Sequence, residues 1–304
     1  MGDTDKTNAS AYCNYNDVFL LYDKNRQPNG LAELLDILSQ TGPAETLTVL
    51  EGGFGTGAYL NILQHHVKAM YGVEGSEQGL AAARQKIGDT GNVRLALGNI
   101  LGLDFRENFF DAYTVNQVLH HLDTSLDFPN LTLFLKEAWR TLKPGGSLII
   151  NTCSQEQLHP LTGVYWSYAY MDAAAARIAA RYVPIETLTR KMTDLGFMDI
   201  KHIVPSGRLF EERYYSDPSL VLEPHFQSSD SIFCLSSPKE IEQADERIRA
   251  GMEDGSVYEQ MKRSMGKAQE IGEAVMISAR KPGDKDKKKN DNSDHHHRGL
   301  AQTT

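Results

Sequence analysis

The sequence predicts an α/β fold built on an open parallel sheet. Short apolar runs alternate along the chain with segments of helical periodicity, the order expected of a parallel sheet with crossover helices. The first run, 47–51, leads through a loop with four glycines into a pattern spaced like a helix. Strand, tight turn and helix in this order are typical of the nucleotide-binding corner of an α/β sheet.

Each further element follows from a local pattern. The predicted insertion at about 205–272 contains two helices and precedes the last strand, and Gly251 to Gly255 is predicted to separate these helices. A turn at 143–146 precedes the fifth strand, and Gly196 ends a helix. The predicted strands are 47–51, 69–74, 93–97, 112–116, 147–152, 197–200 and 273–280; the predicted helices are 57–68, 77–87, 131–142, 173–181, 184–195, 236–249 and 256–271.

We expect one large domain at 31–281, preceded by a tail and aromatic cap segment at 1–30. The charged stretch 282–304 has no apolar period, which predicts disorder, and its three adjacent histidines are assigned no metal site.

Composition and charge disfavour several classes of partner and location. Forty acidic residues against 31 basic ones repel polyphosphate backbones, so we expect no nucleic-acid partner. The three cysteines, Cys13, Cys153 and Cys234, lack the spacing of a metal site and suit a reducing compartment. No apolar run is long enough to span a bilayer and no signal peptide is evident, so we expect a cytoplasmic protein without a membrane partner. The oligomeric state stays open.

The acidic residue before the glycine loop indicates the chemical class of the ligand that the loop binds. In the register Glu51-x-Gly53-x-Gly55-x-Gly57 a carboxylate precedes glycines that allow positive φ and close approach of the backbone. That carboxylate would repel a pyrophosphate but attract an ammonium group, and S-adenosylmethionine has an ammonium and no phosphate. The loop also satisfies G-x-G-x-x-A, with Glu74 at the distance of a ribose ligand. An NAD(P)-dependent oxidoreductase therefore stays open, with Tyr258 and Lys262 in the Tyr-x-x-x-Lys pattern.

Several motifs in order carry a resemblance. Residues 50–57, 71–74, 97–100, 110–122 and 142–146 resemble those of the class I S-adenosylmethionine-dependent methyltransferases, especially the ubiquinone- and menaquinone-type small-molecule branch, and the similarity extends over about 15–281. The resemblance implies a doubly wound, Rossmann-like sheet of seven mostly parallel strands with the last strand antiparallel. It also implies an enzyme that moves a methyl group to a small-molecule acceptor by in-line displacement.

The resemblance implies which residues would contact each part of the cofactor. Glu51 and the loop glycines would hold the methionine end, Glu74 the ribose hydroxyls, and Asn99 with Ile100 the adenine. Asparagine keeps the acceptor oxygen of the more usual aspartate but loses its charge. The full predicted cofactor set is Glu51, Gly53, Gly55, Gly57, Glu74, Asn99, Ile100, Gln117 and Arg26, in which Arg26 would pair with the cofactor carboxylate.

The acceptor side is less determined. His120 and His121 follow the fourth strand and could act as a general base, or could shape the site without proton transfer. Tyr15 and Tyr22 of the cap segment and Trp166 of an aromatic cluster could contact the substrate or pack in the core. The Asn-Pro-Pro-Tyr loop of nucleic-acid amino methylases is absent at 116–119. A non-catalytic S-adenosylmethionine-binding partner protein is a further alternative, since fold alone does not fix function.

Overall fold

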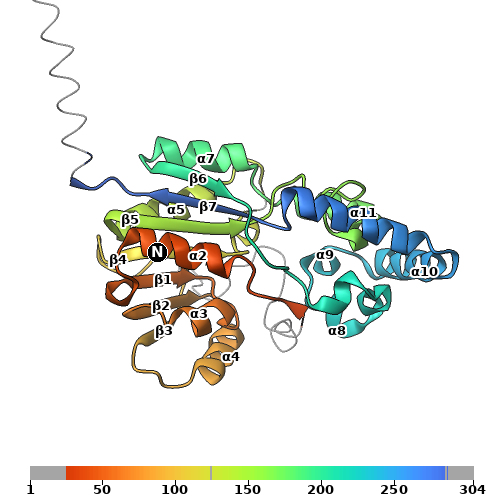
Figure 1. Ribbon diagram of the computed structural model, residues 1–304, viewed down its shortest axis with the longest axis horizontal. Helices are drawn as coiled ribbons and strands as arrows, with labels where there is room; N and C mark the ends of the chain where they lie inside the picture. The colour runs from red at the N-terminus through yellow and green to blue at the C-terminus, as the bar shows by residue number, and fades with distance from the viewer. Residues whose placement is uncertain (1–24, 124, 285, 287–304) are drawn as a thin grey trace, which may run out of the picture.

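A seven-stranded sheet forms one half of the molecule and a helical lobe the other (Figure 1). The structure is a computed structural model that describes residues 25–123, 125–284 and 286. The strand order is β3-β2-β1-β4-β5-β7-β6. The strands are β1 Thr48–Gly52, β2 Ala69–Glu74, β3 Val93–Leu97, β4 Phe110–Asn116, β5 Leu142–Thr152, β6 Met198–Ile203 and β7 Val275–Arg280.

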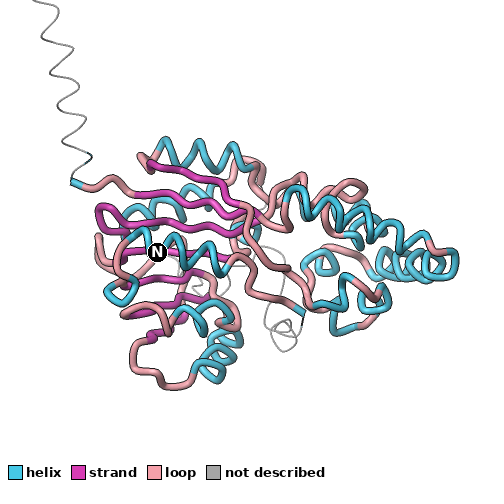
Figure 2. Tube along the Cα trace, in the orientation of Figure 1, coloured by secondary structure: helices cyan, strands magenta, loops and turns pink. Residues whose placement is uncertain are grey.

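The sheet is mostly parallel. Strands β3, β2, β1, β4 and β5 pair in parallel, whereas β7 lies between β5 and β6 and runs antiparallel to both. This arrangement confirms the predicted fold class, including the antiparallel last strand. Figure 2 shows the strands confined to the sheet half, with only helices and loops in the lobe.

Alternate residues of a strand point to opposite faces of the sheet, and here both sets are apolar. Helices therefore cover both faces. Val49 packs in the core cluster of α2 (Leu31–Thr41), α3 (Ala58–Leu63) and α4 (Glu77–Ile87). Its neighbour Leu50 packs in the cluster of α5 (Pro129–Thr141) and α7 (Ile185–Asp194). The sheet is therefore doubly wound, and the carboxyl ends of the parallel strands stay open for a ligand.

The helical lobe has a core of its own, built from two chain segments. Residues of 153–182 and of 209–274 share one buried cluster, so the lobe includes more than the predicted insertion at 205–272. The lobe elements are η3 Trp166–Tyr170, α6 Asp172–Ala179, η4 Glu212–Tyr215, η5 Pro218–Leu222, α8 Pro224–Gln227, α9 Ser231–Cys234, α10 Pro238–Asp254 and α11 Ser256–Ile271.

Several predicted boundaries are wrong: helix α3, for example, ends at Leu63 rather than at 68. Helix α10 begins with a capping box at Ser237 and Glu240 and continues through Gly251, which is buried against the start of α11. The break falls at Gly255, whose φ of 87° suits glycine. Strand β5 begins at Leu142 rather than at 147, because Leu142 already pairs with Phe110 of β4.

Within the described residues, no helix is long and apolar enough to cross a membrane. The same residues contain no group of three or more His, Cys, Asp or Glu side chains placed to hold a metal ion.

Candidate cofactor and acceptor site

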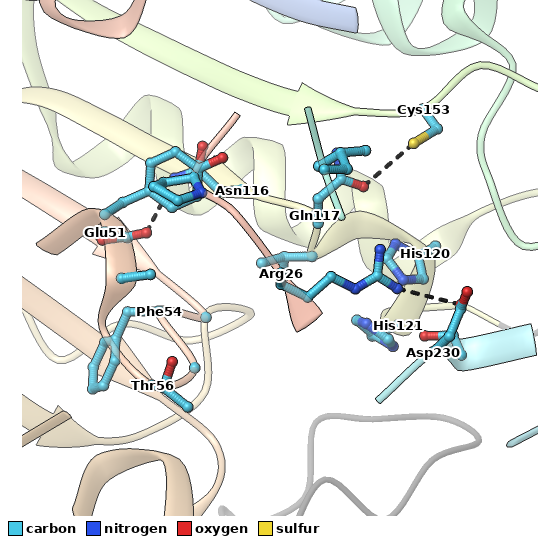
Figure 3. A pocket seen from close by; sticks show the side chains of 18 of the residues that line it. Arg26, Glu51, Phe54, Thr56, Asn116, Gln117, His120, His121, Cys153 and Asp230 are labelled. Atoms are coloured by element: carbon cyan, nitrogen blue, oxygen red, sulfur yellow. Dashed lines mark hydrogen bonds and ion pairs between the residues drawn. The ribbon is translucent and has the colours of Figure 1, made fainter. Parts of the chain in front are cut away.

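One cavity lies at the carboxyl ends of the parallel strands, between the sheet and the helical lobe (Figure 3). Its sheet side is lined by the glycine loop, the end of β2 and the segment after β4. Its lobe side is lined by aromatic and apolar side chains: Leu158, Tyr165, Tyr168, Ile178, Tyr182, Leu209 and Phe210.

The glycines of the loop have distinct roles. Gly53 has a φ of 65°, and a Cβ there would lie 2.8 Å from a Val118 methyl group. Gly55, also at positive φ, donates its N–H to the Glu74 carboxylate at 2.7 Å. Gly57 caps α3, where a Cβ would lie 3.0 Å from the Ala83 Cβ. Gly53 and Gly55 line the cavity, whereas Gly57 lets α3 approach α4.

Glu51 and Asn116 form a buried polar pair beside this loop. The Asn116 amide donates to Glu51 Oε1 at 3.1 Å (Figure 3). The other oxygens of the pair, Glu51 Oε2 and Asn116 Oδ1, have no hydrogen-bond partner among the described residues. Burial, with a smaller contribution from the Glu74 charge, raises the pKa of Glu51 to about 8. A cationic donor placed here would satisfy both oxygens and favour the charged carboxylate.

Glu74 holds the loop from the next strand. Its carboxylate accepts hydrogen bonds from the backbone N–H groups of Gly55 and Ser76, at 2.7 and 3.0 Å. Burial raises the pKa of Glu74, and these backbone donors oppose the shift. Because an ionised carboxylate can accept about four hydrogen bonds, Glu74 has capacity for a ligand in the cavity that it lines.

Only one of the two predicted adenine contacts lines the cavity. Ile100 lines the cavity together with Gly98, but Asn99 does not. The Asn99 side-chain oxygen accepts a hydrogen bond from the Leu101 N–H at 2.9 Å, which shapes the loop from within.

The two histidines lie together where the cavity meets the lobe. The His120 ring stacks on Tyr182 with centroids 4.3 Å apart, and the His121 ring lies 3.8 Å from His120. Burial lowers the pKa of both rings, and Arg181 lowers it further; the pKa of His121 falls to about 3. Both imidazoles are therefore neutral at pH 7.

Arg26 reaches the cavity but turns toward the lobe. Its guanidinium pairs with Asp230 at 3.3 Å and lies 4.0 Å from the Phe210 ring centroid. Gln117, at a φ of 55°, also lines the cavity, and its side-chain oxygen accepts from the Cys153 thiol at 3.5 Å. Burial raises the pKa of Cys153 to about 11, so this thiol stays protonated.

The remaining predicted residues lie elsewhere. Trp166 does not line the cavity; it is buried in the lobe core because its indole N–H finds an acceptor there, the Tyr214 carbonyl at 2.8 Å. Tyr15 and Tyr22 lie outside the described residues. Tyr258 and Lys262 lie on α11 and do not line the cavity. Asn116 and Asp230 line the cavity without having been predicted: no motif marks Asp230, although Asn116 ends a predicted strand.

Comparisons with known proteins find similarity to methyltransferases. A methyltransferase domain model matches residues 50–150. The demethylmenaquinone methyltransferase of Geobacillus sp. is 29% identical over 149 residues, which are 43% of this chain and 61% of that protein. The ubiquinone/menaquinone biosynthesis C-methyltransferase UbiE of Yersinia pestis is 29% identical over 145 residues, covering 42% and 55%. The chain thus spans less than two thirds of these relatives.

Solved structures extend the similarity to the lobe. A putative methyltransferase from an antibiotic biosynthesis pathway of Anabaena variabilis superposes with a TM-score of 0.63 at 18% identity, covering 88% of this chain and 99% of that one. Phosphoethanolamine N-methyltransferase 2 of Haemonchus contortus, solved with S-adenosyl-L-methionine, gives a TM-score of 0.52 at 19% identity over 88% and 57%.

The matched methyltransferase domain lies on the doubly wound, seven-stranded sheet. In this domain and in its fold the chain is similar to class I S-adenosylmethionine-dependent methyltransferases, and its curated sequence relatives include quinone methyltransferases.

Proposed function

We propose that this protein transfers the methyl group of S-adenosylmethionine to a small-molecule acceptor. The observation that carries the proposal is the pair of unsatisfied buried oxygens, Glu51 Oε2 and Asn116 Oδ1, beside the glycine loop. A primary ammonium group supplies the charge and the donors that these oxygens require. A pyrophosphate supplies neither, which disfavours a dinucleotide.

The remaining cofactor contacts follow from the lining of the cavity. Glu74 would accept from the ribose hydroxyls, and Ile100 would pack against the adenine. When bound, S-adenosylmethionine supplies an activated methyl group on a sulfonium. The chain would contribute position and a dry environment, which can provide much of the rate of a displacement.

Several features support a small acceptor. The aromatic wall on the lobe side is buried, so the cavity suits a molecule that can be enclosed. Quinone methyltransferases among the sequence relatives act on small molecules of this kind, as their names state.

His120 and His121 are proposed to act as neutral imidazoles that accept a hydrogen bond from the acceptor. Because the pKa of both rings lies below 6.5, methyl transfer should show no histidine titration between about pH 5.5 and 8. The measurement is kcat against pH for the wild type and for His120→Asn and His121→Asn. An acid limb near pH 6.5 that either variant abolishes would contradict the assignment.

The cofactor is tested by calorimetric titration with S-adenosylmethionine, S-adenosylhomocysteine and NADH. We expect both sulfur ligands to bind and NADH not to bind. Glu74→Ala should weaken binding by about 1 to 3 kcal/mol, the scale of a hydrogen bond to a charged group left unmade. Binding of NADH alone would overturn the proposal and favour the oxidoreductase. Cofactor binding without turnover over a broad acceptor panel would favour the non-catalytic partner protein.

A further inference from the structure

An ion pair on α5 contacts the loop that carries Ile100 to the cavity. Glu137 and Arg140 lie about one turn apart on this helix, and Arg140 donates from Nε and Nη2 to the two Glu137 carboxylate oxygens, both at 2.8 Å. These hydrogen bonds lower the pKa of Glu137, so both side chains are ionised at pH 7. Neither side chain lines the cavity. The pair thus has a fixed, bidentate geometry outside the cavity.

Both side chains bind the backbone of this loop. Glu137 Oε2 accepts from the Leu103 N–H at 2.8 Å. Arg140 donates to the carbonyl oxygens of Leu103 and Phe105, at 2.8 and 2.5 Å. The loop, residues 98–109, joins β3 to β4 and contains no helix or strand, so its backbone groups need partners from other elements. The ion pair supplies such partners to both the N–H and the carbonyl of Leu103.

The bound backbone is adjacent to the part of the loop that lines the cavity. Ile100 is 4% exposed and lines the cavity, and Leu103 is buried in the core cluster that also contains Ile100. Asn99 closes a turn between them, because its side chain and carbonyl accept from the N–H groups of residues 101 and 102, at 2.9 and 3.1 Å. A Cβ on Gly52 would lie 3.0 Å from a methyl group of Ile100. The position of Ile100 against the end of β1 therefore depends on the position of the loop.

We propose that Glu137 and Arg140 are positioning residues that hold Ile100 in place for the adenine of the cofactor. The inference rests on the proposed function, in which Ile100 packs against the adenine. The pair acts through the backbone of residues 103–105 and does not touch the ligand, as a supporting shell does for a binding site. It therefore contributes to the affinity for the adenine end of the cofactor and leaves the affinity for the ribose and methionine ends unchanged.

The test compares S-adenosylhomocysteine with the analogue in which a hydrogen atom replaces the adenine, the base-free analogue. Calorimetric titration measures the first ligand, and competition against it measures the second. Arg140→Met removes the donors but keeps an apolar stem, and it should weaken S-adenosylhomocysteine about tenfold, the effect of one hydrogen bond of a charged group. The affinity for the base-free analogue should stay within about twofold of the wild-type value, because this ligand does not reach Ile100.

Two further variants serve as controls. Arg140→Lys keeps the charge without the forked geometry, so its loss for S-adenosylhomocysteine should be intermediate. Arg177→Met is the matched control: Arg177 pairs with Glu240 at 2.7 Å and donates to the Leu235 carbonyl at 2.9 Å, but it lies in the lobe and does not line the cavity. Both affinities should be unchanged in this variant. Hydrogen exchange within 101–105 should be faster in Arg140→Met and unchanged in Arg177→Met.

The outcomes separate this inference from the proposed function. Wild type that binds neither S-adenosylhomocysteine nor the base-free analogue would overturn the proposed function, and the role toward adenine with it. If the wild type binds S-adenosylhomocysteine, an Arg140→Met variant that weakens both ligands equally, or neither of them, would overturn this inference alone. A purely structural role predicts equal weakening, because a general loss of order affects both ligands together.

Discussion

Glu51→Gln is expected to lower the affinity for S-adenosylmethionine and S-adenosylhomocysteine by about 10- to 100-fold at pH 7.5. The variant keeps the size of the side chain and the hydrogen bond with Asn116, but it removes the charge that an ammonium requires. Charge-assisted hydrogen bonds contribute about 1.5 to 3 kcal/mol, which gives this range. Calorimetry measures the effect, with the exposed Glu45→Gln as the control. Equal affinities of wild type and Glu51→Gln would contradict the assignment.

The folding stability of the wild type should depend on pH in a way that the stability of Glu51→Gln does not. In the ligand-free folded protein the pKa of Glu51 is raised from 4.5 to about 8. Between these values the folded state holds a proton that the unfolded state has lost, so the contribution of Glu51 to stability is present below pH 4.5 and is lost as the pH rises to 8. Glu51→Gln cannot titrate. The free energy of unfolding of Glu51→Gln, relative to that of the wild type, should therefore increase from pH 5.5 to pH 8 by on the order of a few kcal/mol.

Urea unfolding at these two pH values checks this expectation. Saturating S-adenosylhomocysteine should reduce the difference in the wild type, because its ammonium compensates the ionised carboxylate. A stability difference that does not change with pH would contradict the burial argument for Glu51.

Trp166→Ala is expected to lower the free energy of unfolding by about 3 to 5 kcal/mol, the usual cost of truncating a buried tryptophan. The side chain is 1% exposed, stacks at a tilt on Tyr214 with centroids 5.5 Å apart, and donates to the Tyr214 carbonyl. Urea unfolding followed by circular dichroism measures the change.

Trp166→Phe is the matched control. Phenylalanine keeps a ring against Tyr214 but loses the indole N–H, so the expected loss is smaller, with about 1 kcal/mol attributable to the hydrogen bond. If Trp166→Ala left stability unchanged and instead raised the KM for an acceptor, the sequence prediction of a substrate contact would be favoured over the core position.

The sheet and the cofactor end of the cavity could be predicted from the sequence because their signals are local. The predicted bounds of β2, α4 and α11 agree with the structure, since each has a clear period and a turn or cap at its ends. The glycine loop, Glu51 and Glu74 are separated by few residues and form one recurrent unit of strand, turn and helix.

The lobe side could not be predicted because its residues meet through tertiary contacts. Arg26 and Asp230 are about 200 positions apart in the sequence, and no spacing rule connects them. Trp166 belongs to an aromatic cluster that could wall a pocket or fill a core. The position of Tyr214, contributed by a distant segment, determines which role applies.

The place of β7 has a consequence for how the chain folds. The last strand occupies an interior position, where β5 and β6 both pair with it. Until residues 275–280 leave the ribosome, β6 has no partner strand in the sheet, and the lobe core also lacks Ala274. The sheet can therefore be completed only after residues 275–280 have been synthesised. Its folding depends on contacts between residues that are far apart in the sequence.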